Sequence, residues 1–106
     1  MAETPHRKLV RDQIPAIVET EGRRPVTRLL DEKEYFAELV RKLHEEVAEF
    51  AAEPSTEELA DILEVVHALA HCFEGGMPNL EQVRNEKRRK RGGFEERVFL
   101  ECVREA

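Results

Sequence analysis

Two apolar stripes at helical spacing, one on each side of a single proline, constrain the fold of this chain more than any other feature. The first stripe recurs at steps of three and four residues from Phe36 to Phe50, and the second does so from Leu59 to Phe73. Pro54 ends the first helix and leaves only a short connection to the second. The pattern therefore predicts an antiparallel helical hairpin.

The rest of the chain extends this hairpin into a mostly α fold, which we expect to be a single domain over residues 1–106. Polar residues that can cap a helix at its N-terminus, and glycines that can end it, predict a short helix over 12–22 and a fourth helix over 79–92. Residues 25–30 have little helical patterning, and residues 94–100 fit a strand as well as a helical turn. Both segments are candidates for short extended pieces.

Charge is distributed unevenly along the chain. Of 106 residues, 23 are acidic and 17 are basic, which gives a net charge of −6. Residues 84–91 hold six of the basic residues and one acid, so the remainder carries −11. A net-acidic protein is a poor general binder of nucleic acid. A strongly acidic chain with one local basic segment is instead expected to bind cations, or a polyanion whose charge is bridged by cations.

Composition also bears on the cellular compartment. No apolar run approaches the roughly 20 residues of a membrane span, and none resembles a secretion signal. The two cysteines, Cys72 and Cys102, cannot build a disulfide scaffold. We therefore expect a cytoplasmic protein without membrane contact.

Four carboxylates stand out on the predicted hairpin. Glu46 and Glu49 are three residues apart on its first helix, and Glu58 and Asp61 are three apart on its second. At ~100° per residue, each pair projects from one flank of its helix and borders the apolar seam. Like charges at the edge of a low-dielectric seam repel one another and lose hydration, so a cation is expected to neutralise them.

A hard divalent cation fits this set of oxygen donors best. Mg²⁺ takes carboxylate oxygens and commonly bridges them to substrate phosphates, and we expect Mn²⁺ as a substitute ion. The alternative to a metal site is that these carboxylates lie on an ordinary solvent-exposed helix face. Glu is a good helix former, and Glu58 could complete a capping box with Ser55. Zinc is disfavoured, since His67 and His71 point away from the apolar stripe and no HExxH motif occurs.

Four runs of the sequence together resemble a known family. They are KLVRDQIP (8–15), KLHEEVAEF (42–50), EELADILEV (57–65) and EKRRKRGGF (86–94). These runs resemble the all-α nucleoside triphosphate pyrophosphohydrolases, which comprise the MazG-like proteins and the phosphoribosyl-ATP pyrophosphohydrolase-like group. The resemblance covers nearly the whole chain.

The resemblance implies a site and a reaction. The family's metal motif, ExxE followed by ExxD, falls on Glu46, Glu49, Glu58 and Asp61. The implied reaction is the Mg²⁺-dependent hydrolysis of a nucleoside triphosphate, or a related nucleotide, to the monophosphate and pyrophosphate, in a clearing role for the nucleotide pool. We expect Glu49 to accept the proton of the attacking water, because it projects furthest from the seam.

Basic residues supply candidate contacts to substrate phosphates. The family's K-x-x-x-R pattern falls on Lys87 and Arg91, and Lys8 and Arg11 belong to the first matching run. The alternatives are a solvated basic helix end that complements the helix dipole, and a polar helix entry.

Two other functions stay open at this point. One is a non-catalytic helical module that binds nucleotide, or binds nucleic acid through residues 84–91. The other is the phosphoribosyl-ATP pyrophosphohydrolase of histidine biosynthesis. If the protein is a pyrophosphohydrolase, we expect it to be a homodimer or homotetramer. One hairpin cannot cover both apolar faces of so small a domain, so helices of another copy should complete the bundle.

Overall fold

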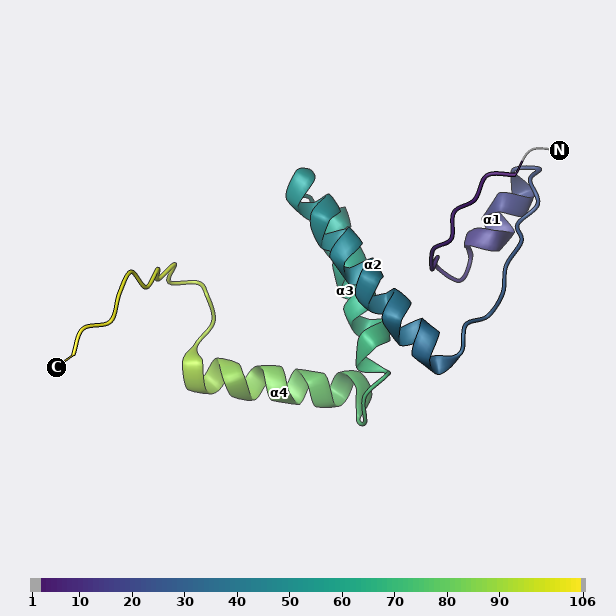
Figure 1. Ribbon diagram of the computed structural model, residues 1–106. Helices are drawn as coiled ribbons and strands as arrows, with labels where there is room; N and C mark the ends of the chain where they lie inside the picture. The colour runs from purple at the N-terminus through teal and green to yellow at the C-terminus, as the bar shows by residue number, and fades with distance from the viewer. Residues whose placement is uncertain (1–2, 106) are drawn as a thin grey trace.

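The computed structural model describes residues 3–105 and contains four α-helices and no strand within that range (Figure 1). The helices are α1 (Ile14–Thr20), α2 (Glu32–Ala52), α3 (Thr56–Ala70) and α4 (Gly76–Arg91). The expectation of a mostly α fold is confirmed. No helix in the described range has the length and apolar character needed to cross a bilayer.

The hairpin formed by α2 and α3 lies where the sequence pattern predicts it. Asp31 caps α2, since its Oδ1 accepts a hydrogen bond from the backbone N–H of Glu34 at 2.8 Å. Ser55 caps α3 in the same way, because its Oγ accepts from the backbone N–H of Glu58 at 3.1 Å. These local bonds set the starts of both helices and thereby the positions of the acidic residues along them.

The boundary between α3 and α4 differs from the sequence-based expectation. α3 ends at Ala70, three residues before Phe73, and α4 begins at Gly76 instead of near Asn79. Gly75 has φ +87°, a left-handed conformation that glycine adopts without a steric penalty. The reversal at Gly75 therefore lets the next helix start directly after it.

The buried interior is small and lies in the seam between α2 and α3. Among the described residues only Leu39, Val65, Ala70 and Glu46 are buried. Three of these are apolar, and the fourth is a carboxylate. A single hairpin therefore provides a hydrophobic core that also encloses a charged group.

The chain is far more extended than a compact domain of its length. Its radius of gyration is 19.0 Å, against about 13 Å for a compact chain of roughly 100 residues. Figure 1 shows α4 and the C-terminal segment running away from the hairpin. α1 packs against none of the other helices. One copy therefore has no closed helical bundle.

The two candidate extended pieces do not form strands. Residues 25–30 and 94–100 are irregular and largely exposed. A strand needs a neighbour for its backbone hydrogen bonds, and neither segment has one within the described chain.

Candidate metal centre

Three of the four predicted carboxylates meet between α2 and α3. Glu46 of α2, with Glu58 and Asp61 of α3, each place a carboxylate oxygen so that all three atoms lie within 4.8 Å of one another. The antiparallel packing of the hairpin produces this arrangement, because it sets the last turns of α2 beside the first turns of α3. We call these three residues the acidic cluster.

Two oxygen atoms of the acidic cluster are buried without a partner. The Oε2 atoms of Glu46 and Glu58 are shielded from solvent and accept no hydrogen bond within the described chain. A buried polar atom left unpaired costs about 1–3 kcal/mol, and more when it is charged. Each of these two oxygen atoms could therefore still accept a hydrogen bond or bind a cation.

Burial and repulsion oppose ionisation of these acids. Burial raises the pKa of Glu46 above its usual range, and the charge of Glu49 raises it further, whereas Lys42 acts in the opposite direction. Burial also raises the pKa of Glu58, with added repulsion from Glu49 and Asp61. A bound cation would relieve both effects.

Glu49 takes a different position from the other three predicted ligands. It is exposed and lies outside the group of atoms that approach within 4.8 Å. It is nevertheless near enough for its charge to raise the pKa of Glu46 and of Glu58. The structure thus places Glu49 at the solvent side of the acidic cluster.

Two basic side chains contact the acidic cluster. Lys42 Nζ lies 3.6 Å from Oε1 of Glu46, and Arg11 Nη2 lies 2.6 Å from Oδ1 of Asp61. Lys42 was missed in the sequence analysis, although its spacing four residues before Glu46 on one helix is a recognisable signal. No local signal could reveal the contact between Arg11 and Asp61, because the two residues are 50 positions apart.

The other predicted phosphate-binding residues do not reach the acidic cluster within one copy. Lys8, Lys87 and Arg91 are exposed. α4 begins beyond the carboxyl end of α3, whereas the cluster involves the first turns of α3, and Figure 1 shows α4 leading away from the hairpin. Of the four predicted basic residues, only Arg11 contacts the cluster.

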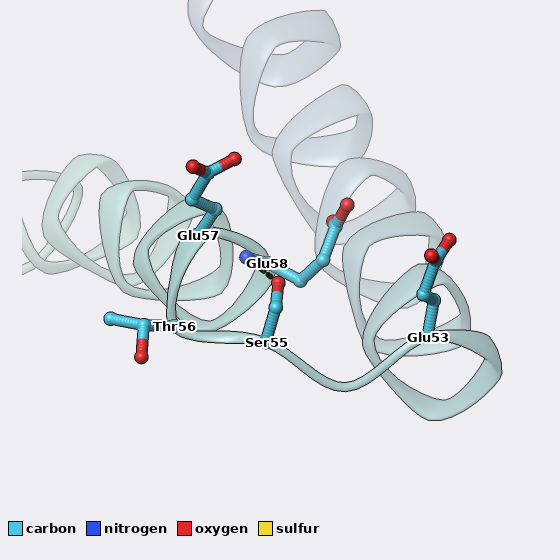
Figure 2. Close-up of a pocket in the computed structure, with 5 residues that line it drawn as sticks. All are labelled: Glu53, Ser55, Thr56, Glu57 and Glu58. Carbon is cyan, nitrogen blue, oxygen red and sulfur yellow. Dashed lines mark hydrogen bonds between the residues drawn. The ribbon is translucent and has the colours of Figure 1, made fainter.

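A shallow depression lies at the turn of the hairpin, beside the acidic cluster. Figure 2 shows the Glu58 side chain running toward α2, while Thr56 points away. Glu53 and Glu57 also line the depression, as does Ser55, whose Oγ accepts the capping hydrogen bond from the backbone N–H of Glu58. Glu58 therefore belongs both to the acidic cluster and to the lining of this depression.

The residues of the acidic cluster suit a hard divalent cation. They offer carboxylate oxygens only, which Mg²⁺ and Mn²⁺ prefer, and two of those oxygens have no other partner. No histidine belongs to this group within the described chain, and the His71 ring nitrogen Nδ1 instead lies 2.8 Å from the backbone carbonyl of His67. The donor chemistry thus favours magnesium over zinc.

Comparison with known proteins gives one partial relative. No family model matches the chain, and no solved structure matches it. An uncharacterized protein of Mycolicibacterium smegmatis is 53% identical over 45 residues, which are 42% of this chain and 46% of that protein. The match therefore spans less than half the length of this relative, and the resemblance to the pyrophosphohydrolases stays a prediction.

Proposed function

We propose that this protein is a cytoplasmic, Mg²⁺-dependent nucleotide pyrophosphohydrolase that converts a nucleoside triphosphate, or a related nucleotide, to the monophosphate and pyrophosphate. One observation carries the proposal. The Oε2 atoms of Glu46 and Glu58 are buried and unpartnered in a three-carboxylate cluster whose geometry suits a divalent cation. The likeness of four sequence runs to the all-α pyrophosphohydrolases supplies the reaction class.

The residues divide into ion-holding and proton-accepting groups. Glu46, Glu58 and Asp61 would hold Mg²⁺, which supplies charge neutralisation for a triphosphate and activation of water. Glu49 is exposed at the solvent side of the acidic cluster, so it is free to accept the proton of an attacking water. Arg11 is the nearest candidate for a phosphate oxygen, because its guanidinium already contacts the cluster.

Three further basic residues belong to the proposal, although they do not contact the acidic cluster within one copy. Lys8, Lys87 and Arg91 are exposed cations, and substrate phosphates are their chemical complement. Because α4 leads away from the acidic cluster, we expect smaller losses of activity from Lys87→Ala and Arg91→Ala than from loss of a residue of the cluster.

We further propose that the enzyme works as a homodimer or homotetramer. The hairpin has an outer apolar face whose side chains are between 41% and 65% exposed, and it consists of Phe36, Val47, Leu59, Leu63 and Phe73. The rings of Phe36 and Phe73 pack edge to face at 6.2 Å, which joins the stripes of the two helices into one surface. A second copy would complete a helical bundle over this face. Light scattering that finds a stable monomer would contradict this part of the proposal.

The enzymatic proposal has a direct test. The protein is incubated with Mg²⁺ and a panel of nucleoside triphosphates that also includes phosphoribosyl-ATP, and monophosphate and pyrophosphate are measured. We expect turnover by the wild type, a strong loss in Glu46→Gln and Glu49→Gln, and retention in Glu64→Gln, an exposed acid of the same hairpin. Unchanged turnover in both site variants would refute the assignment of the site. Preference for phosphoribosyl-ATP would select that narrower activity.

One observation favours a second candidate, a non-catalytic module that binds nucleotide or nucleic acid. Residues 84–91 are exposed, and within the described chain Lys87, Lys90 and Arg91 make no ion pair. This candidate predicts no hydrolysis, together with a salt-sensitive affinity that falls when residues 88–91 are neutralised.

A further inference from the structure

One polar contact ties the N-terminal segment, residues 3–23, to the hairpin. Arg11 Nη2 lies 2.6 Å from Oδ1 of Asp61, a residue of the acidic cluster. No other hydrogen bond or ion pair within the described chain joins the N-terminal segment to α2 or α3. α1 packs against neither helix, and Figure 1 shows it standing apart from the hairpin. The position of the N-terminal segment on the hairpin therefore depends on the pair of Arg11 and Asp61.

Arg11 also lies in the turn that starts α1. Its backbone carbonyl accepts a hydrogen bond from the N–H of Ile14, the first residue of α1, at 3.0 Å. On the other side of α1, residues 24–31 are irregular and mostly exposed. A movement of Arg11 away from the hairpin would therefore carry α1 with it, and the irregular linker can follow.

Asp61 is at the same time a candidate ligand of a divalent cation. Its neighbour Glu46 is only 7% exposed, and the Oε2 atom of Glu46 is buried without a hydrogen-bond partner, which is the unsatisfied group that an ion would meet. A divalent cation held there would face the guanidinium of Arg11 across the carboxylate of Asp61. Because like charges repel, the ion and Arg11 each weaken the hold of the other on Asp61.

We infer that Arg11 stands in for the metal ion at Asp61, and that binding of the ion releases the N-terminal segment from the hairpin. This inference rests on the metal site of the proposed function and adds a conformational response to it. The coupling is reciprocal, so docking of the N-terminal segment opposes ion binding by the same factor. An exposed ion pair is weak, so we expect the ion to lower the ratio of docked to undocked molecules by about two- to fivefold. The released guanidinium is then available to a phosphate oxygen of a nucleotide.

The test measures distances between α1 and α3 in the full chain. Spin labels are attached at Ala16→Cys and Glu64→Cys, which are exposed positions, and Cys72→Ser with Cys102→Ser removes the native thiols. Dilution with unlabelled protein restricts the signal to distances within one copy. We expect saturating MgCl₂ to replace the docked distance by a broader range in the two- to fivefold ratio given above. NaCl at equal ionic strength should have a smaller effect, although it also screens an exposed pair.

Three variants of the labelled protein separate the pair from the ion. Arg11→Gln should show the broad range of distances already in EDTA, whereas Arg7→Gln, which removes the same charge from the same segment, should behave as the wild type. Glu46→Gln loses a candidate ligand but keeps the pair, so it should need more MgCl₂ for the same change. Docked distances in Arg11→Gln, or an equal effect of NaCl and MgCl₂ on the wild type, would overturn the inference.

Calorimetric titration of the same labelled protein with MgCl₂ distinguishes this inference from the proposed function. If Mg²⁺ binds and the distances stay unchanged, the release of the N-terminal segment is wrong while the metal site stands. If Mg²⁺ does not bind, the metal site is refuted and the release falls with it. Neither readout depends on turnover of a nucleotide.

Discussion

Arg11 and Asp61 form an ion pair in which Nη2 lies 2.6 Å from Oδ1, although 50 residues separate them in the chain. The pair ties the segment before α1 to a residue of the acidic cluster. Both side chains are partly exposed, so the pair contributes only about 0–1 kcal/mol to stability. Its main consequence is chemical, because Arg11 competes with a metal ion for the carboxylate of Asp61.

The first prediction concerns this competition. Arg11→Gln is expected to tighten Mg²⁺ binding by about two- to fivefold, since a competing cation is removed, and to change the free energy of unfolding by less than about 1 kcal/mol. Calorimetric titration with MgCl₂ in the absence of nucleotide measures the affinity. Arg23→Gln is the control, because Arg23 pairs with Glu21 away from the acidic cluster. Weaker Mg²⁺ binding in Arg11→Gln alone would contradict the competition.

The second prediction concerns the buried member of the acidic cluster. Glu46→Gln keeps the size of the side chain but loses its charge, so Mg²⁺ should bind about 100-fold more weakly. Thermal melts with and without MgCl₂ measure the effect as a lost increase in melting temperature. Glu64→Gln should retain the increase, and an equal response to Mg²⁺ in all three proteins would argue against an ion at Glu46.

The third prediction is a pH dependence in metal-free buffer. The pKa of Glu46 is raised in the folded state above the ordinary value of 4.5, so the folded protein binds more protons than the unfolded chain in this range. The free energy of unfolding should therefore fall as pH rises from 4.5 through the raised pKa. Glu34, whose pKa is lowered by its hydrogen bond from Arg28, acts in the opposite direction.

A comparison of two proteins isolates the contribution of Glu46. Denaturant unfolding of the wild type and of Glu46→Gln in EDTA, at several pH values from 4.5 to 7.5, cancels groups such as Glu34 that titrate in both. The stability of the wild type relative to the variant should decline with increasing pH. A relative stability that increases would mean that the buried carboxylate is favoured in its charged form.

The fourth prediction contrasts a buried leucine with an exposed one. Leu39 is 3% exposed in the seam of the hairpin, and Leu29 is 98% exposed before α2. Leu39→Ala should lower the free energy of unfolding by about 2–5 kcal/mol, whereas Leu29→Ala should change it by less than about 0.5 kcal/mol. Chemical denaturation measures both. An equally large loss for Leu29→Ala would show that this side chain is buried in an assembly.

The helical hairpin was predictable because its signals are local. Asp31 and Ser55 bond to backbone groups only three residues away, and Pro54 ends α2 through its own ring. The start of α4 was predicted too late, since the left-handed turn at Gly75 was not distinguished from an ordinary helix stop.

The amino-acid sequence by itself determined the hairpin and the flank that carries Glu46, Glu58 and Asp61, because helical periodicity follows from residues a few positions apart. Only the tertiary structure decided that the Oε2 atoms of Glu46 and Glu58 are buried without a partner, and that Arg11 pairs with Asp61. These outcomes depend on which surfaces of distant segments meet, and no spacing along the chain encodes that.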